Sequence, residues 1–322
     1  MTSNFSRRRF IAGVGVVAAS SAFPRRALGL MQSMYPPMDL SYFDMPIRPA
    51  PGELRIGYAA ITWEKKDRQA IEEIAALGYR GIQLRDNAVK DFSSPGELRD
   101  LLHKRHLTLV ALSSGNVRLD PAVEAEDLAK HIAHAKFLQQ AGGLYLQVID
   151  QKPKGRSITA EDYKRLGRLL TELGKRTADL GIPLGYHNHM GAIGERPEEV
   201  DRILDAADPK HVKLELDIAH YVQGGGDPVK AIERYRDRLL FLHIKDVESA
   251  DPNSNPKARP YRFVELGRGR VDLPAFFGAL ERVKFHGWAI VELDGVPTSS
   301  TTPKESAAIS KDYLEKKLGL RV

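Results

Sequence analysis

The sequence predicts an α/β protein built as a single (β/α)8 TIM barrel, and three observations lead to this prediction. From about residue 54 onward, short apolar runs of strand length alternate with longer stretches whose apolar residues recur at helical spacing. Eight such pairs fill about 265 residues, a size typical of this fold. The turn after the first expected strand, AAITWEKK, has no glycine, whereas an open doubly wound sheet would need a glycine-rich phosphate turn there.

The first four strand and helix pairs follow from apolar periodicity and from helix-end signals. The first helix repeats apolar residues every three or four positions and stops before Gly78. Ser94 begins the second helix with Glu97 in a capping box, and Thr159 with Asp162 begins the fourth. The expected strands are 55–60, 79–84, 107–112 and 144–149, and the expected helices are 67–77, 94–102, 124–141 and 159–180.

The last four pairs contain the most distinctive sequence. Proline in the first turn marks the helices that begin near Pro197 and Pro228. The glycine run 224–226 is expected to be a flexible loop after a strand, and a long loop through 251–270 should precede the seventh helix. The expected strands are 183–188, 212–216, 239–244 and 289–293, and the expected helices are 197–206, 228–235, 273–283 and 303–318.

The amino terminus has the features of an export signal. Residues 1–29 contain the string SRRRFI followed by a short apolar run, which resembles a twin-arginine-type signal peptide. That run is too short for a membrane-spanning helix, so no stable membrane anchor is expected. Residues 30–52, rich in Pro and Met, are expected to form a linker or strap before the barrel domain at 53–320. We therefore expect export by the twin-arginine machinery and a periplasmic or secreted location.

Charge and cysteine content exclude several classes of protein. The formal net charge is +6, but five arginines and no acids lie in residues 1–29, so the rest of the chain is nearly neutral. A nearly neutral barrel domain argues against nucleic-acid binding. The absence of cysteine excludes disulfides, thiolate metal sites and a cysteine nucleophile. Homo-oligomer formation is left open by the sequence.

Four expected strands end in residues that ligate metals. Side chains alternate along a strand, and the carboxyl ends of parallel barrel strands meet at one mouth, where such barrels keep their chemistry. His187, Asp217, His243 and Glu292 should therefore converge there. Two imidazoles and two carboxylates suit Mn²⁺, Co²⁺, Zn²⁺ or Fe²⁺.

Each of these residues also has a purely structural explanation. Asp217 would equally suit a helix cap, and His243 could be a core histidine whose hydrogen bonds are satisfied. His187 and His189, on one strand face, could both be structural. Glu215, one layer deeper than Asp217, is expected to pair with a lysine two residues earlier or to orient a ligand.

Further residues near the strand ends are candidates for catalysis and substrate binding. His189 or Glu292 is expected to act as the base, and Lys245 as a catalytic group that also binds a substrate oxygen. Other expected contacts to a substrate come from His220, Gln147, Gln83, Arg85 and Trp63, with Trp288 as a second aromatic residue that could instead be packing.

Several strings in the second half of the chain resemble a known family. The strings YHNHMG, LDIAHYVQGGGDP, FLHIKDV, ELGRGRVDL and GWAIVELD are similar to the xylose isomerase-like TIM-barrel superfamily, in particular its sugar phosphate isomerase/epimerase and inosose dehydratase members. The resemblance implies a divalent ion held by a carboxylate on the fifth strand and by Asp217, His243 and Glu292 on the next three. Mn²⁺ is expected first, with Co²⁺, Mg²⁺ or Zn²⁺ as alternatives.

The resemblance also implies a reaction on a sugar, keto-sugar or cyclitol by proton abstraction α to a carbonyl. Isomerisation or epimerisation is the leading expectation, and the alternative is a lyase or dehydratase. The departure lies at His187, where many epimerases carry a glutamate, and a single remaining base favours dehydration. Less favoured are an endonuclease IV-like nuclease and a non-catalytic sugar-binding protein.

Overall fold

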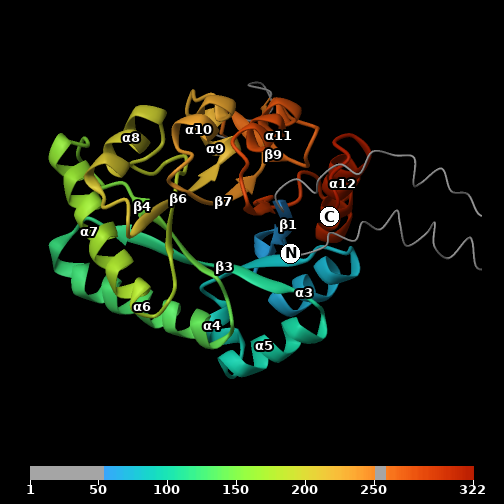
Figure 1. Ribbon diagram of the computed structural model, residues 1–322, viewed down its shortest axis with the longest axis horizontal. Helices are drawn as coiled ribbons and strands as arrows, with labels where there is room; N and C mark the ends of the chain where they lie inside the picture. The colour runs from blue at the N-terminus through green and yellow to red at the C-terminus, as the bar shows by residue number, and fades with distance from the viewer. Residues whose placement is uncertain (1–53, 251–258) are drawn as a thin grey trace, which may run out of the picture. The chain divides into compact units, whose positions relative to one another are not determined.

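Eight parallel strands close into a barrel with helices around it in the computed structural model, which describes residues 54–250 and 259–322 (Figure 1). The strand order is β1-β10-β7-β6-β5-β4-β3-β2. The predicted TIM barrel is thereby confirmed. The predicted signal peptide at 1–29 and strap at 30–52 lie outside the described residues. Within the described part of the chain, no helix is long and apolar enough to cross a membrane.

The barrel strands alternate with helices in sequence, as expected. The strands are β1 (Leu54–Ala59), β2 (Gly81–Arg85), β3 (Thr108–Arg118), β4 (Tyr145–Gln151), β5 (Leu184–His187), β6 (Val212–Asp217), β7 (Leu239–Ile244) and β10 (Gly287–Val291), with the hairpin strands β8 (Asp246–Ser249) and β9 (Tyr261–Val264). The helices are α3 (Asp67–Ala76), α4 (Ala88–Asp91), α5 (Pro95–Lys104), α6 (Glu124–Gln140), α7 (Ala160–Ala178), α8 (Pro197–Ala206), α9 (Ile218–Gln223), α10 (Pro228–Arg234), α11 (Leu273–Arg282) and α12 (Pro303–Lys316), with 3-10 turns η2 (Ala60–Trp63) and η3 (Pro121–Val123).

The alternation of side chains along each strand separates the helix-packed layer from the barrel interior. On β6, Leu214 and Leu216 are fully buried and belong to the apolar core that the helices share, while Glu215 and Asp217 take the opposite parity. The strand parity thus directs polar residues inward.

Helices approach the strands closely where glycine permits it. A Cβ at Gly174 of α7 would lie 2.2 Å from the carbonyl oxygen of His211, so only glycine fits there.

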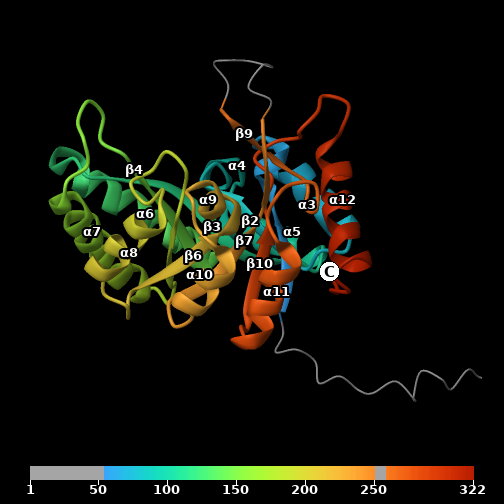
Figure 2. The ribbon, with the colours of Figure 1, turned by 90° about the horizontal axis from the view of Figure 1, so that it is seen from above.

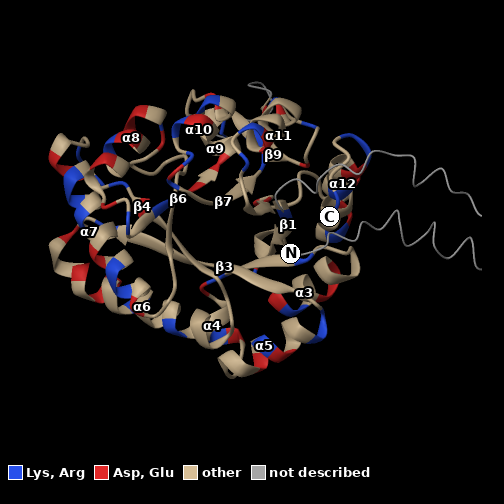
Figure 3. Ribbon diagram, in the orientation of Figure 1, with Lys and Arg blue, Asp and Glu red and all other residues tan. Residues whose placement is uncertain are grey.

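Charged side chains of both signs are interspersed over the outer helices (Figure 3). On α7, for example, Arg168 pairs with Glu161 and Arg176 with Glu172. Such exposed pairs contribute little to stability, roughly 0.2 to 1 kcal/mol each. The mixed surface is consistent with the nearly neutral charge of the barrel sequence.

The largest departure from the predicted fold is the segment after β7. The sequence predicts a long loop through 251–270, but β8 and β9 form an antiparallel hairpin in which Asp246 pairs with Val264. In Figure 2, β9 stands above β7 and β10. The loop prediction is wrong for β9, whose pairing with β8 could not be recognised because a polar, proline-containing stretch separates the two strands in the sequence. Two further differences are the extension of β3 to Arg118 and the short helix α9 where a loop was expected.

A single buried carboxylate anchors this hairpin to the barrel. Asp246 is fully buried and accepts hydrogen bonds from the backbone N–H groups of Val247, Gly267, Gly269 and Val271, at 2.9 to 3.1 Å. Gly269 packs so closely that a Cβ there would lie 2.2 Å from an Asp246 oxygen. The segment 267–271, which follows the hairpin, is therefore held in place by the carboxylate of one side chain.

We expect Asp246→Ala to destabilise the protein by roughly 3 kcal/mol or more, because it leaves several buried N–H groups without an acceptor. Thermal unfolding should show a midpoint lowered by about 6 to 12 °C. Asp227→Ala is the control, since Asp227 is an exposed cap of α10 that accepts from Val229 and Lys230 and should cost only about 1 kcal/mol. Equal losses in the two variants would contradict the anchoring role.

Candidate metal centre and active site

Four side chains from consecutive barrel positions meet at the carboxyl ends of β5, β6, β7 and β10. His187, Asp217, His243 and Glu292 each offer one ligand atom, and these atoms all lie within 4.8 Å of one another. All four residues are at most 8% exposed. The convergence predicted from strand parity is therefore present in the structure.

Local hydrogen bonds place Asp217 and Glu292 at the ends of their strands. Asn188 donates to the Asp217 carbonyl and accepts from the Asp217 N–H, which ties the end of β5 to the end of β6. Asp217 Oδ1 accepts the backbone N–H of His220 and so caps α9, leaving Oδ2 directed at the cluster. The cap role and the site role therefore coexist. The Glu292 N–H donates to the carbonyl of Ile244, which extends the ladder between β10 and β7.

Unsatisfied buried atoms concentrate in this cluster, which is what a cation site requires. Among the described residues, ten buried side-chain nitrogen or oxygen atoms lack a hydrogen-bond partner, and three of them belong to the cluster: His187 Nδ1, Asp217 Oδ2 and His243 Nδ1. Buried polar groups normally have partners, so a concentration of orphans indicates a missing ligand. The donor set of imidazole nitrogen and carboxylate oxygen fits a divalent ion.

The charges around the cluster also favour a bound cation. Burial lowers the pKa of His187 well below its usual value, so this ring is neutral. Burial acts in the same direction on His243, but the carboxylates of Glu215 and Glu292 outweigh it and raise the pKa of His243 well above its usual value. Burial raises the pKa of Glu215 to about 7. Without a metal, the site thus retains a proton on an imidazole to offset its carboxylates.

His243 is oriented by groups on its far side. Its Nε2–H donates to the amide oxygen of Gln83 at 2.8 Å, and the same nitrogen is in close contact with Glu215 Oε1. Its Nδ1 faces Glu292 Oε1 at 3.4 Å and Asp217 Oδ2 at 3.6 Å. The expected pairing of Glu215 with the lysine two residues earlier is wrong. That lysine, Lys213, reaches out of the barrel to the Asp237 carbonyl instead.

Lys245 is fully buried beside the cluster and is surrounded by carboxylates. Its Nζ lies 2.8 Å from Glu292 Oε1 and 2.5 Å from Asp294 Oδ1. Burial alone would lower the pKa of Lys245, but Asp294 and Glu292 raise it above its usual value. The ring of Phe263 on β9 covers the same ammonium, with Nζ 4.1 Å from the ring centroid. Lys245 is therefore a permanent cation that holds Glu292.

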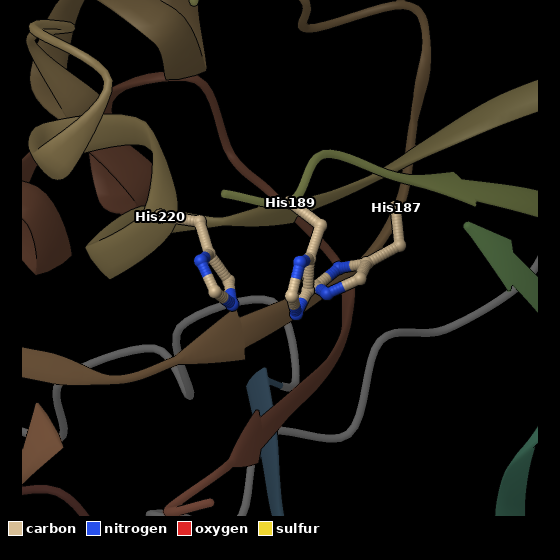
Figure 4. Close-up of side chains that lie close together, drawn as sticks. All are labelled: His187, His189 and His220. Atoms are coloured by element: carbon tan, nitrogen blue, oxygen red, sulfur yellow. The ribbon is translucent and has the colours of Figure 1, made fainter. Parts of the chain in front are cut away.

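Three histidine rings lie next to one another along one side of the mouth: His187, His189 and His220 (Figure 4). The peptide groups of Met190 engage two of them. His189 Nδ1 donates to the Met190 carbonyl at 2.7 Å, which leaves its Nε2 as a free acceptor. The Met190 N–H donates to His220 Nδ1 at 3.2 Å, so the proton of the neutral His220 ring lies on Nε2.

His220 consequently has no lone pair left for a metal ion. Its Nε2 is 3.9 Å from Asp217 Oδ2 and 3.5 Å from Lys245 Nζ, whose shorter contacts are with carboxylates. Burial lowers the pKa of His220 well below its usual value, which keeps the ring neutral. The three histidines therefore do not form a second cation site of the same kind.

A polar cavity of about 520 Å³, part of it open to solvent, extends from the cluster toward β2, β3 and β4. Arg85 pairs with Ser113 and Ser113 with Gln147 in the strand register, so these side chains form one row opposite the metal ligands. The cavity is lined by Ala59, Ile61, Gln83, Arg85, Ser113, Gln147, Ile149, His187, His189, His243, Glu292 and Asp294.

The structure does not bring every predicted substrate contact into this cavity. Trp63 is 1% exposed, packs on Tyr58 and donates its indole N–H to Glu73 at 2.7 Å, so its prediction as a sugar-stacking residue is corrected. Trp288 is core packing beside Gly81. His220 and Lys245 are buried and are not among the lining residues, and Lys245 contacts Glu292 and Asp294, which are.

Sequence reasoning missed two residues of the site, Asp294 and Ser113. Asp294 lies two positions beyond Glu292 and pairs with Lys245, and strand parity would have indicated it. Ser113 falls just past the predicted end of its strand, which continues to Arg118 through a bulge. A correct strand length would have placed Ser113 beside Gln147.

Proteins of known sequence and structure are similar to this chain over most of its length. The inosose dehydratase of Lacticaseibacillus casei is 29% identical over 296 residues, covering 81% of this chain and 96% of that protein. The inosose dehydratase of Geobacillus kaustophilus is 27% identical over 293 residues, covering 81% and 94%.

Two solved structures share the fold. The IOLI protein with a binding zinc atom has a TM-score of 0.68 at 20% identity, covering 82% of this chain and 97% of that one. The 3-keto-D-glucoside 4-epimerase YcjR from E. coli has a TM-score of 0.66 at 17% identity, covering 82% and 100%. The family model described as xylose isomerase-like TIM barrel matches residues 71–317, and the chain therefore belongs to that family.

Proposed function

We propose that this protein is a metal-dependent lyase that removes water from a polyhydroxylated ketone, a keto-cyclitol or a keto-sugar. The observation that carries the proposal is the buried group of His187, Asp217, His243 and Glu292 at the end of a polar cavity. In the reaction a base removes the proton α to the ketone, the C–H electrons form the carbon–carbon double bond, and the β-hydroxyl leaves with a proton as water.

The four clustered residues would hold one divalent ion, with Mn²⁺ proposed first and Co²⁺, Mg²⁺ or Zn²⁺ as alternatives. Such an ion would act as a Lewis acid that polarises the ketone oxygen and stabilises the negative charge developing there. His187, neutral through burial, and Nδ1 of His243 would supply the nitrogen ligands. Asp217 Oδ2 and a Glu292 oxygen would supply the anionic ligands.

Within this site, His189 is the proposed base. It lines the cavity, and its Nδ1–H is held by the Met190 carbonyl, so its Nε2 lone pair is available for the α-proton. Glu292 is the alternative base, but Lys245 already occupies one of its oxygens at 2.8 Å. Lys245 and the Nε2–H of His220 are proposed to stabilise substrate oxygens from behind the ligands.

The polar row opposite the ligands suits a substrate with several hydroxyl groups. Arg85, Ser113 and Gln147 would bind the part of the substrate remote from the ketone. The Gln147 amide oxygen is buried without a partner, so a substrate hydroxyl would satisfy it. Only three of the lining residues, Ala59, Ile61 and Ile149, are apolar.

Dehydration is favoured over the leading expectation of isomerisation by two observations. His187 stands where a two-base epimerisation would use a carboxylate, and the relatives at 27 to 29% identity are named inosose dehydratases. Epimerisation is the second candidate, supported by fold relatives such as the 3-keto-D-glucoside 4-epimerase. Both reactions share the first proton abstraction.

Removal of the metal is expected to abolish turnover of 2-keto-myo-inositol. The protein would be treated with EDTA, dialysed and assayed in D₂O before and after Mn²⁺ is restored, with α-proton exchange followed by NMR and enone formation by ultraviolet absorbance. We expect both signals to fall by at least about 100-fold and to return with Mn²⁺. Exchange with epimer formation but no enone would favour the isomerase, and undiminished exchange without metal would contradict both candidates.

A further inference from the structure

We propose that Gln83 is a positioning residue for the metal ligand His243, and that the same amide links the ligand to a bound substrate. This inference rests on the proposed function, because it assumes that His243 Nδ1 holds a divalent ion. The observation behind it is a hydrogen bond across the barrel interior, from His243 Nε2 on β7 to Gln83 Oε1 on β2, at 2.8 Å.

The two strands are not neighbours in the sheet, so their backbone pairing does not impose this contact. β2 lies between β1 and β3, whereas β7 lies between β6 and β10. Gln83 is 2% exposed and His243 is 1% exposed, so the bond is formed out of bulk water. A buried amide placed opposite a buried imidazole contributes specific orientation, because an unmade hydrogen bond there would be costly.

The bond determines which nitrogen of His243 faces the metal ligands. The metal-free ring is protonated, but a ring that ligates a metal ion is neutral and carries its proton on one nitrogen only, and an acceptor at Nε2 holds the proton there. The lone pair is then on Nδ1, which faces Glu292 and Asp217 and has no hydrogen-bond partner of its own. Partners of this kind on the far side of a ligand typically change metal affinity by 10 to 100-fold when removed.

Glu215 is the competing candidate for this role. Its Oε1 is in close contact with the same Nε2, but the hydrogen-bond geometry at this nitrogen is met by the Gln83 oxygen. The N–H direction thus favours the Gln83 amide, while Glu215 adds negative charge nearby. If Glu215 alone oriented the ring, Gln83→Leu would leave the metal affinity unchanged.

The amide nitrogen of Gln83 is available to donate a hydrogen bond to a bound substrate. Gln83 lines the cavity, and its Nε2 donates to none of the residues in 54–250 and 259–322. A substrate hydroxyl could accept from this nitrogen while Oε1 holds His243. Binding of a polyhydroxylated substrate would therefore tighten the hydrogen bond that orients the ligand.

The chain contains a matched control for this proposal. Gln147 has the same side chain, lines the same cavity from β4, and makes no hydrogen bond to His243. Comparing Gln83→Leu with Gln147→Leu separates an effect on the metal from loss of an amide in the cavity. Gln83→Glu is a rescue variant, because its carboxylate can also accept from His243 Nε2.

The test is metal affinity, measured without turnover by calorimetric titration of Mn²⁺ and by the visible spectrum of the Co²⁺-loaded protein. We expect Gln83→Leu to bind Mn²⁺ about 10 to 100-fold more weakly and to show a changed Co²⁺ spectrum. Gln147→Leu should stay within about twofold of the wild type, and Gln83→Glu should recover most of the affinity.

Wild-type affinity in Gln83→Leu, or an equal loss in Gln147→Leu, would overturn the positioning role while leaving the proposed function intact. Absence of binding by the wild-type protein would instead overturn the metal centre itself, and this inference with it. Circular dichroism and the thermal midpoint of each variant establish that it is folded, and Gln83→Glu keeps the proposal testable if the leucine variant does not fold.

Discussion

Glu292→Gln is expected to lower kcat/KM for the dehydration by roughly 10³-fold or more and to release the metal. The change keeps the size of the side chain and removes its charge. Glu292 Oε1 lies 3.4 Å from His243 Nδ1 and 2.8 Å from Lys245 Nζ. In the metal-free protein this one carboxylate therefore offsets the positive charges of both side chains. Losing that charge weakens ligation and leaves a buried ammonium poorly compensated.

The measurements are enone formation from 2-keto-myo-inositol and metal content after gel filtration. Glu265→Gln is the control, because Glu265 is also a buried glutamate but accepts from Ser306 and Arg268 away from the ligands. It should retain metal and stay within about threefold of the wild-type rate. A Glu292→Gln protein that keeps both its metal and its rate would show that Glu292 is not a ligand.

Much of the barrel could be predicted because parallel strands are buried on both faces. Runs such as 239–244 are continuously apolar and bounded by polar segments, which makes a strand recognisable without knowledge of its neighbours. The β8 and β9 hairpin could not be predicted in this way. Its stability depends on Asp246, whose carboxylate accepts hydrogen bonds from backbone N–H groups more than twenty residues away.

The convergence of the metal-ligand candidates could be predicted because it follows from strand parity and from the common end at which barrel strands finish. For His187 and Asp217 only the parity along the strand had to be right, so an error of one residue in where each strand ends did not matter. Contacts across the barrel could not be predicted. The bond between Gln83 and His243 depends on barrel closure, and Trp63 is removed from the cavity by its packing on Tyr58.

Lys245→Met is expected to separate metal binding from catalysis. In the metal-free protein, Lys245 offsets the charge of Glu292 and Asp294 and lies 3.8 Å from Asp217 Oδ2. Without the ammonium these carboxylates remain close together with less compensation, so the metal-free variant should be less stable by about 3 to 5 kcal/mol. Thermal unfolding with and without Mn²⁺ should show that the metal reverses most of the decrease in the midpoint temperature.

The same substitution should strengthen metal binding while weakening turnover. Lys245 repels a divalent ion at the neighbouring ligands and competes with it for Glu292, so Mn²⁺ should bind about tenfold more tightly when the lysine is absent. The rate should nevertheless fall by about 100-fold, since the charge that would stabilise the developing oxyanion is lost. Lys213→Met, a lysine on β6 that contacts the Asp237 carbonyl instead, should change neither quantity. Weaker Mn²⁺ binding by Lys245→Met than by the wild type would contradict this prediction. It would show that Lys245 supports the metal ligands rather than competing with the ion.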